Sequence, residues 1–172
     1  RSSKLGMDNG IFWNTGDESD EMGHISEDPQ IRIKMMDKRM SRLDLALESI
    51  PINQQVVSFE VHDYTIISWG STKGPIIDAQ DMLKKEGIDI GFIQIKLLHP
   101  FPTEYVKSLL KDAKVLIDIE ANHSGQLGKI FKQNISRDID YHILKYTGRG
   151  MTSTEIYDSL KKIVENKAAK RE

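Results

Sequence analysis

The chain has 172 residues and a formal net charge of -2, with 24 Lys and Arg residues against 26 Asp and Glu residues. This balance argues against a nucleic-acid-binding protein, whose surface usually carries a strong basic excess. Cysteine is absent, which excludes disulfides, cysteine-ligated zinc, a thiol nucleophile and iron–sulfur ligation by this chain. No apolar stretch approaches the roughly 20 residues of a bilayer span. We therefore expect no membrane contact and a cytoplasmic location.

Residues 1–52 are predicted to form an extended N-terminal arm and a linker helix. The segment from Gly6 to Gln30 is rich in Gly, Asp, Glu and Asn and has no sustained periodicity, which is typical of an extended segment. Phe12 and Trp13 stand together in it, and such a pair usually lies on a partner or on the body of its own protein. The acidic run TGDESDEMGH at 15–24 lacks the spacing of a calcium-binding loop. We interpret it as a solvated or partner-facing turn.

The linker helix is predicted to begin at Pro29, with Asp28 as its N-cap, and to end before Pro51. An apolar stripe recurs at helical spacing, and it consists of Ile33, Met36, Met40, Leu43 and Leu47. The opposite face is basic and carries Lys34, Lys38 and Arg39.

Residues 53–172 alternate between apolar runs and helical patterns. The apolar runs are at 64–69, 91–95 and 115–119, with a weaker one at 141–145. A further run at 56–61 is expected to be an edge strand and is a candidate for antiparallel pairing. Helical stretches cover 73–86, 102–112, 124–136 and 152–166. This alternation predicts an α/β fold, a three-layer α/β/α sandwich with a mostly parallel sheet of about five strands. Gly87 as a C-cap, and Thr152 or Ser153 as an N-cap with Glu155, support the helix boundaries.

The loops that follow the parallel strands are the expected location of any ligand site. The first runs from Gly70 to Gly74, but Lys73 precedes the second glycine, so neither a Walker A loop nor a dinucleotide fingerprint is present. One interpretation is a bend at Gly70, with Ser71 or Thr72 capping the next helix. The alternative is weak anion binding at the helix N-terminus by Ser71, Thr72 and Lys73.

A later loop brings Glu120, Asn122, His123, Ser124 and Gln126 together after a strand. A carboxylate beside a histidine could transfer protons. The same residues could also form a polar loop in which Glu120 accepts backbone N–H bonds and Ser124 caps the next helix. The histidines are scattered singly, and no spacing for a metal site or a catalytic triad is visible. We predict no catalytic residue and no metal ligand on this chain.

Several motifs in order resemble a known family. They are WGST at 69–72, HPFP at 99–102, E-x-N-x-S-G-Q-L at 120–127 and YTGR at 146–149. The arm's TGDESDEMG and the Lys38-Arg39 pair complete the series. The chain resembles the C-terminal domain of the alpha subunit of 2-oxoacid:ferredoxin oxidoreductases. It departs from the family pattern at Ser19, where histidine is usual, and at Gly150, where proline is usual.

The resemblance implies a domain similar to the C-terminal domain of transketolase. It implies a whole enzyme that oxidatively decarboxylates 2-oxoacids to acyl-CoA, with ferredoxin as the acceptor. That enzyme would use thiamine diphosphate, Mg, a [4Fe–4S] cluster and coenzyme A, with no cofactor on this chain. The implied partners are a beta subunit, the remaining alpha-subunit domains and ferredoxin, in a heteromer. The chain alone would be inactive and would serve assembly. Two alternatives stay open, a domain of another thiamine-diphosphate enzyme and a free-standing nucleotide-binding regulator.

Overall fold

The structure is a computed structural model that describes residue 4, residues 6–10 and residues 13–168. The chain divides into two compact units, Arg1–Ser49 and Ile50–Glu172, and each is described by itself below. Within the described residues, no helix combines the length and the apolar character that crossing a membrane would require.

The first unit consists of an arm whose acidic residues contact its own helix. Ser19 and Ile25 form an isolated antiparallel bridge. Glu18 accepts hydrogen bonds from Arg32, at 3.0 Å, and from Arg39, and Glu21 pairs with Lys34. The ion pair with Arg39, supported by Arg32, lowers the pKa of Glu18 to about 2. Our interpretation of the acidic run as a solvated or partner-facing turn is therefore wrong at Glu18, whose side chain is only 9% exposed and pairs with Arg32 and Arg39. It holds at Glu21, whose side chain stays 75% exposed although it pairs with Lys34.

Helix α1 (Pro29–Ser49) begins where the sequence predicts, since the side chain of Asp28 accepts the N–H of Gln30 at 2.8 Å. It contains no buried residue. Ile33 and Met40, two members of the predicted apolar stripe, are 54% and 55% exposed. Trp13 is also exposed, whereas Phe12 lies outside the described residues. The prediction that the Phe12–Trp13 pair lies on a partner or on the body of its own protein therefore stays a prediction.

The second unit is built around one five-stranded sheet. The strands are β1 (Val56–Phe59), β2 (Tyr64–Ser68), β3 (Gly91–Ile95), β4 (Val115–Glu120) and β5 (Tyr141–Leu144). Their order is β1-β3-β2-β4-β5, with β1 antiparallel to β3 and every other pair parallel. This confirms the mostly parallel sheet and the antiparallel edge strand that the sequence predicts. The short helix α2 (Ile52–Gln55) leads into β1.

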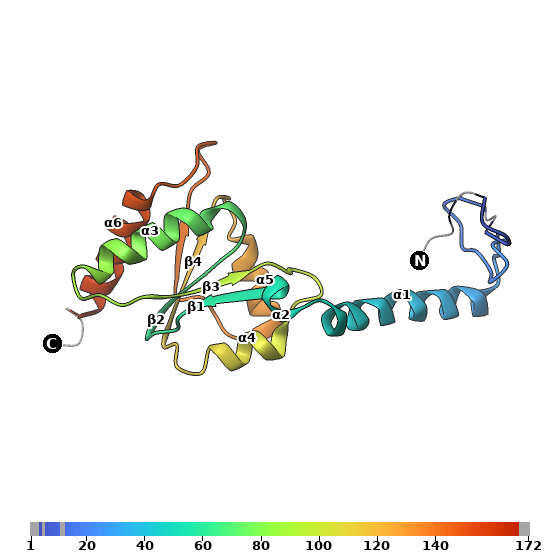
Figure 1. Cartoon of the computed structure of the whole chain (residues 1–172), viewed down its shortest axis with the longest axis horizontal. Helices are drawn as coiled ribbons and strands as arrows, with labels where there is room; N and C mark the ends of the chain where they lie inside the picture. The colour runs from blue at the N-terminus through green and yellow to red at the C-terminus, as the bar shows by residue number, and fades with distance from the viewer. Residues whose placement is uncertain (1–3, 5, 11–12, 169–172) are drawn as a thin grey trace. The chain divides into compact units, whose positions relative to one another are not determined.

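Four helices cover the two faces of the sheet, as Figure 1 shows. Helices α3 (Lys73–Lys84) and α6 (Ser153–Ala168) lie on one face, and α4 (Thr103–Leu109) and α5 (Gln126–Ile135) lie on the other. Alternate residues of β4 face the two cores: Ile117 packs with Ile76 of α3 and Ile156 of α6, whereas Leu116 packs with Phe131 of α5. Burial on both faces explains the continuous apolar character of the central strands. The three-layer architecture is confirmed.

Two helices begin or end at the capping residues that the sequence predicts. Gly87 follows α3 with a φ of 77°, a left-handed conformation that glycine adopts without strain. At α6, the side chain of Thr152 accepts the N–H of Glu155 at 3.3 Å, and Glu155 accepts the N–H of Thr152 at 2.8 Å. These reciprocal bonds form the capping box that the sequence predicts.

Replacing Thr152 with alanine is expected to lower the free energy of unfolding by about 1 kcal/mol, because one N–H in the first turn of α6 loses its acceptor. Urea denaturation monitored by circular dichroism measures this change. Ser153→Ala is the matched control, since the capping bonds involve Thr152 and Glu155 alone. If the two substitutions lowered the free energy of unfolding equally, the capping box would contribute nothing to stability.

Candidate functional site

The carboxyl ends of the neighbouring strands β2 and β4 border a cavity of about 360 Å³. Its walls are Trp69, Gly70, Ser71, Thr72, Ala121, Asn122 and Gln126. Four of the eight residues singled out in the sequence, namely Ser71, Thr72, Asn122 and Gln126, therefore line one hollow. The other four, Lys73, Glu120, His123 and Ser124, lie outside its lining. The ends of parallel strands bring these loops together although about 50 residues of sequence separate them.

Glu120 organises this end of the sheet from a position where it is only 1% exposed. Its Oε1 accepts the backbone N–H groups of Leu127, at 2.8 Å, and Gly128, at 3.3 Å. Its Oε2 accepts the indole N–H of Trp69, at 3.0 Å, and the amide of Asn122, at 2.6 Å. The predicted role of Glu120 as an acceptor of backbone N–H bonds is confirmed, and its oxygens are used by groups of its own chain.

The charge of Glu120 is stabilised by these bonds. Burial by itself raises the pKa of a carboxyl group, but the interaction with the neighbouring Asp118 carboxyl and the hydrogen bonds from the N–H groups outweigh it, so the pKa of Glu120 lies below its ordinary value. Glu120 is therefore ionised at neutral pH. A carboxylate that four donors already hold is poorly placed to act as a general base.

The loop after β4 corrects two expectations. Ser124 does not cap α5: Gly125 occupies the N-cap position with a φ of 59°, and no side chain caps it there. Instead Asn122 Oδ1 accepts the N–H groups of Ser124, at 3.1 Å, and Gly125, at 2.9 Å. His123 packs edge-on against the ring of Tyr146, with centroids 4.6 Å apart, and it makes no hydrogen bond to Glu120 within the described chain. The acid–base interpretation of Glu120 with His123 has no geometric support.

The loop after β2 is a bend at Gly70, whose φ is 68°. No side chain caps α3, so the prediction that Ser71 or Thr72 does so is wrong. The Thr72 hydroxyl turns back to the strand end, where it bonds Ser68 Oγ at 2.6 Å and donates to the carbonyl of Trp69 at 2.9 Å. Lys73 Nζ lies 5.2 Å from the centre of the Phe59 ring and is not part of the cavity lining.

Sequence reasoning missed two titratable residues, Asp118 on β4 and His142 on β5. Asp118 is fully buried, and its Oδ2 lies 2.9 Å from His142 Nδ1. Burial, together with the adjacent carboxylate of Glu120, raises the pKa of Asp118 to about 9. A signal was present, because an acidic residue interrupts the apolar run VLIDIE two positions before Glu120. Period-two alternation places both acids on one face of the strand.

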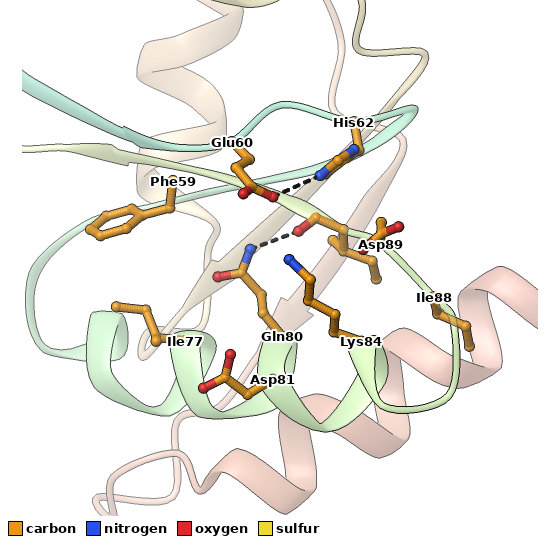
Figure 2. Close-up of a pocket in the computed structure, with 10 residues that line it drawn as sticks. Phe59, Glu60, His62, Ile77, Gln80, Asp81, Lys84, Ile88 and Asp89 are labelled. Atoms are coloured by element: carbon orange, nitrogen blue, oxygen red, sulfur yellow. Dashed lines mark hydrogen bonds and ion pairs between the residues drawn. The ribbon is translucent and has the colours of Figure 1, made fainter.

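A second hollow, of about 250 Å³, lies between the β1–β2 connection and α3, as Figure 2 shows. Its lining carries the acidic residues Glu60, Asp81 and Asp89 and one lysine, Lys84. A hydrogen bond of 3.1 Å joins His62 Nε2 to Glu60 Oε2, and Lys84 projects from α3 toward the same space. This hydrogen bond with His62, with the charge of Lys84 nearby, lowers the pKa of Glu60. Every charged residue of this lining is at least partly exposed. In the described part of the chain, no group of three potential ligating residues could hold a metal ion. The strand-end cavity is therefore the stronger candidate.

Comparison with known families gives a match over most of the second unit. The family model described as pyruvate:ferredoxin oxidoreductase core domain II matches residues 62–164. The 2-oxoacid:ferredoxin oxidoreductase subunit alpha of Saccharolobus solfataricus is 39% identical over 88% of this chain and 24% of its own length. Subunit alpha of the 2-oxoacid:ferredoxin oxidoreductase 1 of Aeropyrum pernix is 34% identical over 91% of this chain and 25% of its own length. The chain thus spans about a quarter of the length of these curated relatives.

Solved structures agree with the sequence comparison. The 2-oxoglutarate:ferredoxin oxidoreductase of Magnetococcus marinus, solved with 2-oxoglutarate, coenzyme A and succinyl-CoA bound, superimposes with a TM-score of 0.80 at 25% identity, over 92% of this chain and 27% of that chain. A split-gene transketolase matches with a TM-score of 0.52 at 18% identity, over 63% of this chain and 42% of that chain. The transketolase likeness shows the shared fold alone, so the alternative of a different thiamine enzyme is not favoured. The chain therefore belongs to the pyruvate:ferredoxin oxidoreductase core domain II family.

Proposed function

We propose that the chain serves assembly in a 2-oxoacid:ferredoxin oxidoreductase of the alpha-subunit type. The whole enzyme would oxidatively decarboxylate a 2-oxoacid, join the acyl group to coenzyme A and pass the electrons to ferredoxin, in the cytoplasm. The similarity to alpha subunits over 88% of the chain supports the enzyme class. The saturated Glu120 carboxylate is the observation that supports an assembly role, since the group most suited to chemistry is engaged by its own chain.

The described residues of the cavity do not fit the diphosphate group of thiamine diphosphate. A diphosphate needs cationic side chains or unpaired N–H groups. The cavity lining contains no Lys or Arg among the described residues. At the start of α5, the N–H groups of Leu127 and Gly128 are already bound by Glu120. We therefore assign thiamine diphosphate, Mg and the [4Fe–4S] cluster to other parts of the enzyme.

The rim of the cavity has properties that suit a protein contact. Trp69 is 36% exposed, although its indole N–H donates a hydrogen bond to Glu120. The side chains of Ser71 and Gln126 are exposed and take part in no hydrogen bond between described residues. A rigid aromatic ring surrounded by polar side chains is typical of interface anchors. The proposed occupants are the beta subunit and the remaining domains of the alpha subunit, with residues 1–52 as an arm and linker helix that join residues 53–172 to them.

Isothermal titration of the chain with thiamine diphosphate and Mg²⁺ is expected to show no heat of binding. The same titration of the assembled enzyme, stripped of its cofactor, is the positive control. Because the lining offers the diphosphate neither a cation nor an unpaired N–H of α5, we expect no saturation up to millimolar cofactor. Saturable binding to the chain at micromolar concentration would contradict the assembly proposal. Adding ATP in a separate titration tests the nucleotide-regulator alternative in the same way.

A further inference from the structure

A buried acidic cluster lies beneath the N-terminal turn of α5, on the face of the sheet that α5 covers. Asp118 and Glu120 both come from β4, and His142 comes from the facing position of β5, since Asp118 and His142 are register partners. The helix leaves room for them only because it carries glycine there. A Cβ added at Gly128 would lie 2.9 Å from His142 Cε1 and 3.2 Å from Asp118 Oδ2. The site is therefore built to hold these side chains.

The hydrogen bonds of the cluster account for where its protons are. Two adjacent buried carboxyl groups cannot both be ionised without a large electrostatic cost. Glu120 receives four hydrogen bonds from N–H groups, so it is the member that carries the charge. Asp118 Oδ1 receives no hydrogen bond from any described group. An oxygen without a donor, next to a carboxylate, is satisfied only if it bears the proton itself.

We propose that Asp118 is a positioning residue that, as a neutral carboxylic acid, donates a hydrogen bond to Glu120 and so fixes Trp69 and Asn122 in the wall of the strand-end cavity. Asp118 and Glu120 lie two residues apart on one face of β4, and Glu120 in turn accepts hydrogen bonds from the indole of Trp69 and the amide of Asn122. This role does not depend on the enzyme class or on the identity of the partner. The shape of the cavity therefore depends on the protonation of Asp118, a residue that does not itself line the cavity.

Within the described residues, the titratable side chains that face Asp118 come from β4 and β5. Glu120 faces it from its own strand and His142 faces it from β5. Helix α5 presents Gly125 and Gly128 to it. His142 is 44% exposed at its side chain, so it gives the buried acid a route for proton exchange with solvent. Loss of the Asp118 proton leaves two carboxylates side by side, and their repulsion weakens the hydrogen bond from Trp69 to Glu120.

The indole of Trp69 reports on this event, and Trp13 is removed by a Trp13→Phe substitution to isolate its signal. In that background, Trp69 emission is expected to change with a midpoint near pH 9, the value to which burial raises the pKa of Asp118. Asp118→Asn is the decisive variant, because an amide donates to Glu120 at every pH. Its Trp69 spectrum at pH 7 should match that of the parent, and the alkaline transition should disappear. A transition that persists in Asp118→Asn, or one that is absent from the parent, overturns the proposal.

A second measurement decides which residue holds the proton. If His142 were an imidazolium facing an ionised Asp118, the ¹³C shift of the Asp118 carboxyl at pH 7 would be that of a carboxylate. We expect the shift of a protonated acid. We also expect His142→Gln to keep the alkaline transition of Trp69, because Asp118 still bears the proton. A carboxylate shift at pH 7, or loss of the transition in His142→Gln, refutes the assignment.

Discussion

Replacing Glu120 with alanine is expected to lower the free energy of unfolding by about 3–5 kcal/mol, the usual cost of removing one partner from a buried ionic network. The indole N–H of Trp69 and the N–H groups of Leu127 and Gly128 would lose their acceptor inside the protein. Each unpaired buried donor costs about 1–3 kcal/mol. Urea denaturation at pH 7, followed by far-ultraviolet circular dichroism, measures the loss.

Two controls separate this effect from simple loss of a side chain. Glu120→Gln keeps one acceptor oxygen and is expected to lose less stability than Glu120→Ala. Glu104→Ala removes a carboxylate that is 88% exposed, and surface substitutions of this kind usually change stability by less than about 0.5 kcal/mol. If Glu120→Ala were as stable as Glu104→Ala, the hydrogen bonds at the carboxyl end of β4 would contribute nothing to the fold.

Replacing Gly91 with alanine is expected to lower the free energy of unfolding by about 3 kcal/mol, the upper part of the range for overpacked sites. Gly91 begins β3, where a Cβ would lie 2.8 Å from the Cα of Val61 and 2.8 Å from the backbone nitrogen of His62. Backbone atoms cannot rotate away as the end of a side chain does. The β1–β2 connection or the start of β3 would have to shift. Thermal and urea denaturation both measure this cost.

Gly74→Ala is the matched control for Gly91→Ala. Gly74 lies in the first turn of α3, and a Cβ there meets no atom within 4 Å. Alanine has the higher helix propensity, by up to about 1 kcal/mol. The two glycine-to-alanine substitutions should therefore change stability in opposite directions. A stabilising Gly91→Ala would mean that the close approach of the chain to Gly91 is absent in solution.

The fold was predictable because its signals are local. The apolar run at 115–119 predicts a buried strand, because β4 is covered on both faces and every residue in it is apolar or buried. The cap of α6 was predictable because Thr152 lies only three residues from its partner Glu155. The caps at α3 and α5 were not predictable in the same way. A hydroxyl near a helix start, such as that of Thr72 or Ser124, is an ordinary capping signal. Here Thr72 bonds the strand end, and the helix α5 receives its acceptor from Glu120, which precedes Leu127 by seven residues.

The buried cluster required strand register, which hydrophobic periodicity does not supply. Asp118 and His142 are 24 residues apart in sequence and meet because β4 and β5 pair in parallel with these two residues opposite each other. The pairing of Glu18 with Arg39, 21 residues away, was missed for the same reason. An acidic run and a basic helix face were both visible in the sequence. Their contact depends on how the arm folds back, which composition does not determine.

Thiamine diphosphate content of the assembled enzyme tests the central claim most directly, namely that the strand-end cavity joins proteins and holds no cofactor. The variant Ser71→Arg/Gln126→Arg adds two charges to exposed positions of the rim. Asp78→Arg, at an exposed position of α3, is the control. We expect the rim variant to lower the yield of complex with the beta subunit, while each complex that forms keeps its full complement of thiamine diphosphate. Complexes that assemble at normal yield but lack thiamine diphosphate would contradict the account.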